Sequence, residues 1–389
     1  MNPRDNLMDK TYVTVIVPLY KGNKYISSVI DQIESSAKAF GGRIQLVFSN
    51  DYPDESIPDN LHSDLIDITC LQTDNNCGIQ GARVKGLKAA QGDYIHFLDQ
   101  DDEIEPEYYQ RQMERIGDAD AVVCNCTWDG EQFYDTPRRP SLSKCLTLEY
   151  NIDDDFGFVP GQVILRKESI PEYWINNWMN WNCCDDYLLW LLLFSKGKRI
   201  VANDSILYHH IYTGFNQGTN LYAWYRSTFE MLDIIRKERL FDEEIIDRFE
   251  NARLKQVKLL CDSETDHLKR TRVYERILDL YSSDGNSPDE VFALKGCKIA
   301  LYGYRLGIRL VPLFGKFGLD VECMVDIRDG LESSHCPVVK PDEIPNEIDC
   351  IISTLISDDT ELRRQLSKKY PEKKIIGITD ALGLRRQKG

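Results

Sequence analysis

The chain has 389 residues, of which 42% are hydrophobic, and a formal net charge of −16. At roughly 100–200 residues per domain, this length predicts two or three domains. Nucleic-acid binding needs clustered Lys and Arg, so such an acidic chain is a poor candidate for it. The charge also argues against electrostatic adhesion to an anionic membrane. Small anionic substrates stay open, because a bound divalent cation inverts the local field.

The twelve cysteines are scattered, and their close pairs form no C-x-x-C. No His follows at zinc-finger spacing, which disfavours a structural zinc. The first ten residues lack the apolar stretch of a signal peptide, and no apolar run reaches the roughly 18–20 residues of a spanning helix. We therefore expect reduced cysteines and a cytoplasmic protein, with at most peripheral association at the inner face of the plasma membrane.

Short apolar strands alternate with amphipathic helices over the first hundred residues. The expected strands are Thr14–Val17, Gln45–Phe48, Ile68–Leu71 and Tyr94–Leu98. Glu105-Pro106 is expected to open a further helix. This β-α-β-α order predicts an α/β layer on a mostly parallel sheet.

The pattern changes in the second half of the chain. Apolar residues at spacings of three and four from Leu221 to Tyr281 predict a helical segment, and Ser282–Pro288 is typical of a linker. Three further strands are then expected, at Lys298–Tyr302, Val321–Val325 and Asp349–Thr354. The predicted organisation is a first domain over residues 1–218, a helical segment over 219–288 and a small α/β domain over 289–389.

Three polar clusters follow predicted strands, where ligands bind in open parallel sheets. They are Pro18–Tyr20, Asn50–Asp51 and Asp99–Asp102. Asp99 and Asp101 can share one hard cation, Mg²⁺ or Mn²⁺, with the oxygens of a diphosphate. Such a cation would neutralise charge on a leaving nucleoside diphosphate. The alternative is a solvated acidic loop that caps the helix from Glu105.

The segment NNCGIQGARVKGLKAAQGDYIHFLDQDD, after VTVIVPLY and a strand ending in Asn-Asp, resembles the family 2 glycosyltransferases of the GT-A fold. The pattern departs from the family at Val84, where Asn is usual, and in a shorter loop after Asp51. The positions in register with the family pattern are Asn76, Gly78, Ala82, Arg83, Gly86, Leu87, Ala90, Gly92, Tyr94, Ile95, Phe97, Leu98, Asp99, Asp101 and Asp102.

The resemblance continues downstream and covers about residues 12–216. FVPGQVILRKESI is similar to the family's acceptor-side strand, and CCDDYLLWLLLFSKG to its E-D-x-x-L-W helix. YHHIYTGFN is similar to the Tyr/His segment that follows that helix. The aromatic group Tyr173, Trp174, Trp178 and Trp181 either stacks on sugar rings, faces a lipid-linked acceptor, or belongs to an ordinary core.

The resemblance implies a GT-A (nucleotide-diphospho-sugar transferase) domain of α/β class with site residues of three kinds. The nucleotide-sugar contacts it implies are Pro18, Tyr20, Asp51, Asn76, Arg83, Asp99 and Gln100. The acceptor-side residues are Gly161, Gln162, Asp185 and Trp190. The metal ligands are Asp99, Asp101 and His210, with Mg²⁺ or Mn²⁺ as cofactor. A histidine after a strand is otherwise a packed structural residue.

Asp186 is the predicted catalytic base. Sugar transfer needs a base that takes the proton of the acceptor hydroxyl. A carboxylate in the first turn of a helix is held rigidly, and the helix amino end favours its ionised form. Without the resemblance, Asp185 and Asp186 would be interpreted as an N-cap pair.

The C-terminal domain resembles the small Rossmann-like module that follows some bacterial glycosyltransferases. Gly303 and Gly307 after a strand, with Asp326 ending the next strand, form an imperfect dinucleotide-binding turn. Arg305 stands where a second glycine would let the backbone approach a pyrophosphate. We favour a structural or partner-binding role there over nucleotide binding.

The predicted function is transfer of a hexose or N-acetylhexosamine from a nucleotide-diphosphate donor, and the resemblance implies that the transfer is inverting. The expected acceptor is a saccharide or lipid-linked saccharide in surface polysaccharide biosynthesis. One alternative is a sugar nucleotidyltransferase, although VPLYKGNKY is a poor phosphate loop. The other is a non-catalytic scaffold with a partner-binding Rossmann-like domain.

Overall fold

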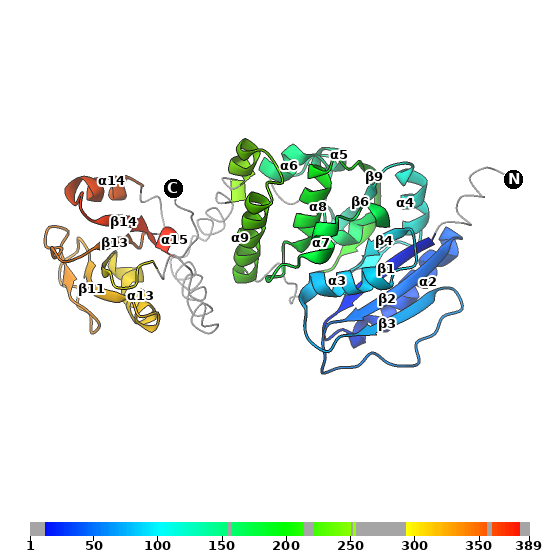
Figure 1. Ribbon diagram of the computed structural model, residues 1–389, viewed down its shortest axis with the longest axis horizontal. Coiled ribbons are helices and arrows are strands. Elements are labelled where there is room, and N and C mark those ends of the chain that lie inside the picture. The colour runs from blue at the N-terminus through cyan, green and yellow to red at the C-terminus, as the bar shows by residue number, and fades with distance from the viewer. Residues whose placement is uncertain are drawn as a thin grey trace. The chain divides into compact units, whose positions relative to one another are not determined.

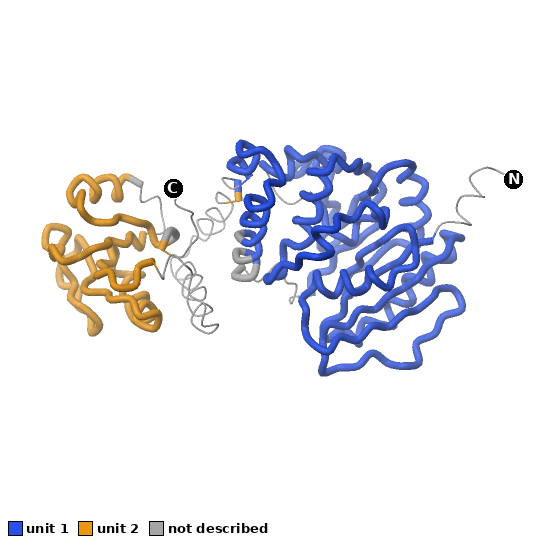
Figure 2. The backbone as a smooth tube through the Cα atoms, in the orientation of Figure 1, with its two compact units in different colours: residues 1–252 blue, residues 253–389 orange. Residues whose placement is uncertain are grey.

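The computed structural model describes residues 12–153, 157–213, 221–249, 252–253, 293–355 and 360–381. The chain divides into two compact units, residues 1–252 and 253–389 (Figure 2). The segment expected to be helical, 219–288, is therefore described only in part, and the predicted linker Ser282–Pro288 lies outside the described residues.

The first unit is built on one mixed sheet with the order β3-β2-β1-β4-β8-β6-β9-β5, and β7 pairs with β6 (Figure 1). Its first four strands run parallel, as predicted. They are β1 (Tyr12–Leu19), β2 (Arg43–Asn50), β3 (Asp67–Gln72) and β4 (Tyr94–Phe97). Seven consecutive residues of β1 are buried, which is typical of a parallel strand covered on both faces.

In the other half of the sheet, only the strand that the resemblance implied within FVPGQVILRKESI was predicted. β8 (Val163–Arg166) lies between β4 and β6 (Ala121–Trp128) and is antiparallel to both. β9 (Ile200–His210) runs parallel to β6, and β5 (Glu103–Ile104) pairs antiparallel with β9. β7 (Glu131–Gln132) turns back on β6 through a hairpin. Apart from the local β6–β7 hairpin, these pairings join segments far apart in sequence, so local patterns do not reveal them.

Helices that pack on this sheet and on one another carry several of the site residues. α2 (Ile26–Phe40) ends at Gly41, whose φ of 72° suits glycine. α3 (Gly78–Ala89) packs on β1 and β2, and α4 (Tyr108–Ile116) begins two residues after the predicted Pro106. α7 (Glu172–Asn176) and α9 (Leu221–Lys237) both pack on α8 (Asp185–Ser195). The short helices α5 (Leu142–Cys145) and α6 (Leu148–Asp153) complete this side of the unit.

The second unit holds a parallel sheet of order β12-β11-β10-β13-β14, which confirms a second α/β unit. Its strands are β10 (Lys298–Tyr302), β11 (Asp320–Val325), β12 (Val338–Val339), β13 (Cys350–Ser353) and β14 (Lys374–Gly377). Its helices are α13 (Tyr304–Lys316), α14 (Thr360–Lys369) and α15 (Ile378–Ala381). Across both units, none of the described helices is long and apolar enough to cross a membrane.

Candidate functional site

The three polar clusters predicted from the sequence meet at one edge of the first sheet. β1 lies between β2 and β4, with Leu19 opposite Asn50 and Ile16 opposite Phe97. The peptide N–H of Asp51 donates to the carbonyl of Leu19 at 2.8 Å. The carboxyl ends of three neighbouring parallel strands therefore carry the candidate site, as expected for an open parallel sheet.

Residues Asp99–Asp102 form an acidic turn after β4, and Gln100 connects this turn to the loop after β1. Its side-chain oxygen accepts from the N–H of Tyr20 at 3.0 Å, and its side-chain amide donates to the Tyr20 carbonyl at 3.3 Å. A Cβ on Gly22 would lie 2.2 Å from the same Gln100 oxygen. Both polar ends of Gln100 are thus used to position the loop, so it acts on a ligand only through Tyr20.

Tyr20 offers a ring to solvent at this edge, with 46% of its surface exposed. The ring of Tyr52 meets it edge to face at 5.2 Å. The ammonium group of Lys21 lies 5.6 Å from the centroid of Tyr20 and 5.2 Å from that of Tyr52. Neither Lys21 nor Tyr52 was predicted. The two rings and the cation suit a ligand with a flat ring and an anionic group.

Asp51 is buried and already has two donors. Its Oδ1 accepts from the backbone N–H and from the thiol of Cys77, each at 2.8 Å. Burial, with the hydrogen bond to Asp51 second, raises the pKa of the Cys77 thiol to about 11, which keeps it a donor. The predicted neighbour Asn76 is exposed, and its side-chain oxygen accepts from the N–H of Gly78 at 3.0 Å. It therefore supports the start of α3.

Arg83 joins the two acidic parts of the site. From α3, its Nη2 donates to Asp99 after β4 and its Nη1 donates to Asp185 at the start of α8, each at 2.8 Å. Burial alone would lower the pKa of the guanidinium, but the charges of Asp99 and Asp185 raise it. A permanently charged Arg83 thus binds Asp185, which lies 102 positions further along the chain.

Asp185 and Asp186 lie in different surroundings although they are adjacent. Asp185 is buried against Arg83, whereas Asp186 is partly exposed and its Oδ1 accepts from the N–H of Tyr187 at 2.7 Å. Burial, followed by the charge of Asp185, raises the pKa of Asp186 to about 8. Asp185 therefore holds the start of α8 against Arg83, whereas the Asp186 carboxylate remains partly accessible to a ligand.

The residues predicted for the acceptor side do not line an open surface. The indole of Trp190 is fully buried and donates to the Phe158 carbonyl at 3.2 Å. Gln162 is buried too, and its side-chain amide donates to the Cys124 carbonyl at 2.6 Å. Gly161 packs on Tyr208, where a Cβ would lie 2.2 Å from the ring. These three residues shape the core beneath the site, so the structure does not support their predicted contacts with the acceptor.

Asp101 and Asp102, both in the acidic turn, have different partners. Asp101 accepts from the Thr213 hydroxyl at 3.3 Å, and burial, then the charges of Asp102 and Asp99, raise its pKa to about 6. Asp102 is 1% exposed and binds the segment at the end of β9, where its Oδ1 lies 3.1 Å from Nδ1 of His210. No separate role was predicted for Asp102.

A divalent cation fits part of this cluster. Asp99 keeps one carboxylate oxygen beyond its contact with Arg83. Burial is the main cause of the raised Asp101 pKa, and a cation would relieve the second cause, the repulsion from Asp102 and Asp99. Among the described residues, however, no three His, Cys, Asp or Glu side chains gather as a metal group. His210 lies against Asp102 instead, so its role as the third ligand stays a prediction. A cation held here would take its other ligands from diphosphate and water.

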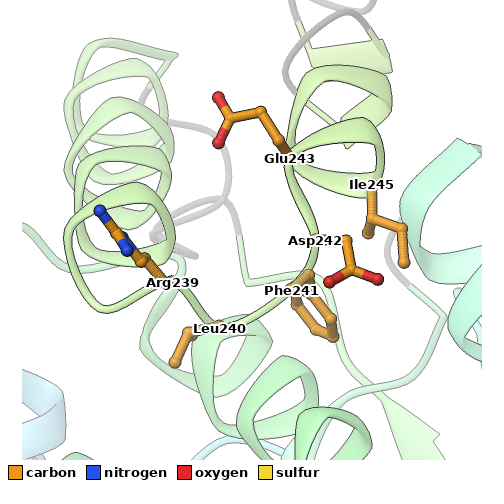
Figure 3. Close-up of a pocket in the computed structure, with 6 residues that line it drawn as sticks. All are labelled: Arg239, Leu240, Phe241, Asp242, Glu243 and Ile245. Atoms are coloured by element: carbon orange, nitrogen blue, oxygen red, sulfur yellow. The ribbon is translucent and has the colours of Figure 1, made fainter.

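A hollow lies elsewhere in the first unit, on the turn that follows α9 (Figure 3). Its lining residues are Arg239, Leu240, Phe241, Asp242, Glu243 and Ile245. In Figure 3, Phe241, Asp242 and Ile245 lie together while Arg239 and Glu243 extend away from them. None of the strand-end residues described above lines it, so we assign the chemistry to the sheet edge.

In the second unit, Asp326 occupies the start of α13. Its carboxylate accepts from the N–H of Tyr304 at 3.0 Å and from both Nε and Nη2 of Arg328, at 2.9 and 2.8 Å. The side-chain hydrogen bond from Arg328 lowers the pKa of Asp326. An amide that would face a pyrophosphate is thus already bound to a carboxylate, which disfavours dinucleotide binding there.

Comparison with known proteins identifies a family for part of the chain. Residues 14–174 match the family model described as glycosyl transferase family 2, which spans less than half of the chain. This part of the chain belongs to that family, and it contains β1 to β4, Arg83 and the acidic turn. The resemblance to family 2 glycosyltransferases is therefore confirmed over residues 14–174.

Two curated proteins are similar in sequence to parts of this chain. The putative glycosyltransferase EpsH of Bacillus subtilis (strain 168) is 28% identical over 121 residues, which is 30% of this chain and 34% of that protein. The succinoglycan biosynthesis protein ExoO of Rhizobium meliloti (strain 1021) is 25% identical over 219 residues, 52% of this chain and 61% of that protein. The chain thus spans about one third to three fifths of the length of these relatives.

Among solved structures, S. aureus TarS 1-349 overlaps with a TM-score of 0.46 at 17% identity, over 69% of this chain and 79% of that chain. The mannosyltransferase PcManGT from Pyrobaculum calidifontis, in complex with GDP-Man and Mn²⁺, overlaps with a TM-score of 0.43 at 16% identity, over 70% of this chain and 81% of that chain. Overlaps this weak carry no conclusion about the site.

Proposed function

We propose that this protein transfers a sugar from a nucleoside diphosphate donor to an acceptor hydroxyl, with inversion at the anomeric carbon. The observation that carries this function is the pair of 2.8 Å contacts from Arg83 to Asp99 and Asp185. They bring the carboxylates suited to a diphosphate next to the helix that carries Asp186. One site then holds both a place for the donor and a base.

The donor's nucleoside would lie at the ends of β1 and β2. The exposed ring of Tyr20 gives a surface for a base, and the second carboxylate oxygen of Asp51 can accept from a base or ribose. Pro18 shapes the end of β1, where it lies opposite Ser49 of β2. Lys21, next to the two tyrosine rings, adds a positive charge near the expected path of the diphosphate.

The diphosphate would lie at Asp99 and Asp101, which would hold Mg²⁺ or Mn²⁺. When bound, the cation supplies neutralisation of the charge that develops on the leaving nucleoside diphosphate. Arg83 keeps Asp99 oriented, since it donates to one of its oxygens at 2.8 Å. The finding that Asp101 has only one weak protein contact among the described residues supports it as the more available ligand.

Asp186 would remove the proton from the acceptor hydroxyl as its oxygen attacks the anomeric carbon. The bond to the donor's diphosphate breaks at the same carbon, and the proton ends on the Asp186 carboxylate. Because burial and Asp185 raise its pKa to about 8, Asp186 holds a proton strongly once it has one. That is the property of an effective base in its ionised form.

The acceptor we propose is a saccharide or lipid-linked saccharide, and the sugar transferred a hexose or N-acetylhexosamine. Support for a polysaccharide comes from the relative named for succinoglycan biosynthesis, which the chain matches over 61% of that protein. The exposed Trp178, near the start of α3, offers a ring on which a sugar could stack.

A thermal-shift screen of UDP, GDP, CDP and ADP, each with and without Mn²⁺, tests this function. A ligand that binds only the folded state raises its stability, by about 2.7 kcal/mol at a hundred times Kd. We expect at least one nucleotide to raise the Tm, and Mn²⁺ to increase that shift in the parent protein but not in Asp101→Asn. Asp129→Asn, which changes an exposed carboxylate on the β6–β7 turn, is the matched control. A chain that responds to none of the four contradicts the proposal.

A further inference from the structure

The second half of the first sheet ends at the same edge as the acidic turn. β8 is antiparallel to both β4 and β6, so β4 and β6 run in the same direction and their carboxyl ends share one edge. In the sheet order, β1 and β2 lie on one side of β4, whereas β8 and β6 lie on the other. The nucleoside is proposed to lie at the ends of β1 and β2. The end of β6 is therefore on the side of the acidic turn that faces away from the nucleoside.

One end of the β6–β7 hairpin lies next to the acidic turn. The ring of Trp128, the last residue of β6, lies on the ring of His210, with the centroids 3.9 Å apart. Nδ1 of His210 lies 3.1 Å from Oδ1 of Asp102, which belongs to the acidic turn. A ligand group beside the hairpin is therefore close to the carboxylates proposed for the diphosphate.

The segment that follows β7 leads toward the helix that carries Asp186. The hydroxyl of Tyr134 donates to the Gly157 carbonyl, and a Cβ on Gly157 would lie 3.0 Å from the side-chain oxygen of Asn151. The Asn151 carbonyl accepts from the hydroxyl of Tyr187, the residue after Asp186. The hairpin region thus extends from the acidic turn toward α8, where an acceptor must lie if it is to meet both the donor and Asp186.

Arg139 lies at the end of the turn that follows this hairpin. Its N–H donates to the Thr136 carbonyl at 3.1 Å, and its carbonyl accepts from the Thr136 N–H at 3.0 Å, so the backbone is held. The guanidinium carbon lies 3.8 Å from the centroid of the Phe133 ring, which stacks on Trp128 at 5.1 Å. The side chain is half-buried. Within the part of the chain that the structure describes, the guanidinium makes no ion pair and no hydrogen bond.

Other arginines of the first unit meet a carboxylate. Arg43 lies 3.2 Å from Asp67, and Arg236 lies 2.8 Å from Glu243. With a net charge of −16, the chain has carboxylates in excess, yet none is placed on Arg139 in the described residues. A guanidinium held against an aromatic ring, with its N–H groups unused, is organised to bind an anion from outside the chain.

We propose that Arg139, supported by the Phe133 ring, forms an acceptor subsite in which the guanidinium binds an anionic group of the acceptor, a carboxylate or a phosphate. The planar guanidinium can donate two parallel hydrogen bonds to either group. The inference rests on the function proposed above, because it takes the acceptor hydroxyl to lie at Asp186. It narrows the acceptor to a saccharide that carries either an acidic sugar or the phosphate of a lipid carrier.

Ligand-detected NMR titrations of the full chain test this subsite, in Mn²⁺ and a saturating nucleoside diphosphate chosen from the thermal-shift screen. The probes are two pairs that differ in the anionic group, methyl β-glucuronide with methyl β-glucoside and geranyl phosphate with geraniol. We expect an anionic probe to bind roughly 10- to 100-fold more tightly than its neutral partner, the range that hydrogen bonds to charged groups contribute. A preference in the first pair indicates an acidic sugar, and one in the second pair a lipid phosphate.

Three variants separate the charge of Arg139 from its packing. Arg139→Met keeps an apolar stem over Phe133 without the charge, so the preference should fall below about twofold while the neutral probe keeps its affinity. Arg139→Lys keeps the charge without the planar pair of donors and should retain part of the preference. Arg138→Met is the matched control, since Arg138 is adjacent and exposed, and it should keep the parent preference. Nucleotide binding should be unchanged in all three variants.

The contrary outcomes are distinct. A parent protein that binds a nucleotide but prefers neither anionic probe overturns this inference alone, as does a preference that survives Arg139→Met. Equal losses for the anionic and the neutral probe in Arg139→Met would show that the arginine only packs on Phe133, which also overturns it. A parent protein that binds none of the four nucleotides contradicts the proposed function, and the acceptor subsite with it.

Discussion

Two adjacent aspartates show how position on a helix separates roles. Successive helix residues point about 100° apart, so Asp185 and Asp186 cannot face the same partner. Asp185 is turned inward and receives Arg83 at 2.8 Å, whereas Asp186 stays partly exposed. This arrangement supports Asp186 as the base and gives Asp185 a structural task that the sequence did not indicate.

Asp186→Asn should reduce transfer by about 10²- to 10⁴-fold, because the amide cannot take the acceptor proton. Donor affinity should survive, since the donor contacts lie at the strand ends. In the parent protein, transfer should rise as the pH increases through about 8, where the Asp186 carboxyl loses its proton. Rates measured against pH at saturating donor test both statements. A pH profile that is flat between 6 and 9, or an active Asp186→Asn, would remove Asp186 from catalysis.

The same pKa shift predicts how stability depends on pH. The Asp186 pKa is raised from 3.8 to about 8 on folding, so the native state holds a proton that the unfolded chain releases. Its contribution to stability is therefore complete at low pH and is lost as the pH rises toward 8. Asp186→Asn should reduce this decline in urea unfolding experiments between pH 5 and 8. An identical decline in both proteins would argue against the shift.

Asp185→Asn is expected to behave differently from Asp186→Asn. Removing one member of a buried ion pair leaves the other charge uncompensated, at a cost of about 3–5 kcal/mol. Arg83 is almost fully enclosed and would keep only Asp99 as an ionised partner. We expect a lower free energy of unfolding for Asp185→Asn, with weaker donor binding as Asp99 loses its orientation. Unchanged stability would show that Arg83 can relax toward solvent.

At the scale of elements, the packing of α3 on β1 decides where Arg83 lies. Gly86 sits directly on β1, because a Cβ there would lie 2.3 Å from Cγ2 of Ile16. Since Arg83 is one turn earlier on α3, a helix displaced at Gly86 also moves the contacts with Asp99 and Asp185. The glycine therefore serves the site through the spacing of two elements.

Gly86→Ala should destabilise the protein by about 1–3 kcal/mol, the usual effect of overpacking. It should also weaken diphosphate binding, because Arg83 would no longer reach both carboxylates. Lys88→Ala, at an exposed position of the same helix, controls for the change in helix composition and should alter stability by less than about 0.5 kcal/mol. Denaturant unfolding and calorimetry of the two variants measure these effects. Equal stability would mean that β1 yields to the added methyl group.

At the scale of the whole molecule, α9 belongs with the first unit. The Glu230 carboxylate accepts from the N–H groups of Asn180 and Trp181, at 2.8 and 3.0 Å. Ser227 accepts from the N–H of Cys184 at 2.9 Å, immediately before α8. The first compact unit extends to Ala252. The boundary predicted at residue 218 would therefore separate α9 from the loop that it supports.

Truncation should reveal this boundary. A chain that ends at Ser283 should keep donor binding and donor hydrolysis, because all proposed site residues precede α9. A chain that ends at residue 218 should lose both, since the residues before α8 lose Glu230 and Ser227. Circular dichroism and the nucleotide screen on both chains are the measurements. Loss of binding in a folded chain ending at Ser283 would instead assign part of the site to the second unit.

The sequence by itself determined the parallel half of the first sheet and its acidic strand ends. Strands β1, β2 and β4 are largely apolar runs between polar loops, and such local patterns depend only on neighbouring residues. The position of Asp99 and Asp101 after β4 follows from the same pattern. The family was indicated by the resemblance of the motif that ends in Asp102, and the family model matches residues 14–174. The second α/β unit was also predicted from its strands.

The tertiary structure alone decided which polar residues face the ligand and which face the core. Gln162 and Trp190 match the family pattern but are enclosed, whereas Asp102 has both oxygens bound by the segment Tyr208–Ile211. Those contacts depend on β9 crossing to β6, a pairing between distant segments that no local pattern encodes. Burial and hydrogen bonding are properties of the packed chain, so the division between structural and available side chains appears only once the strands are in place.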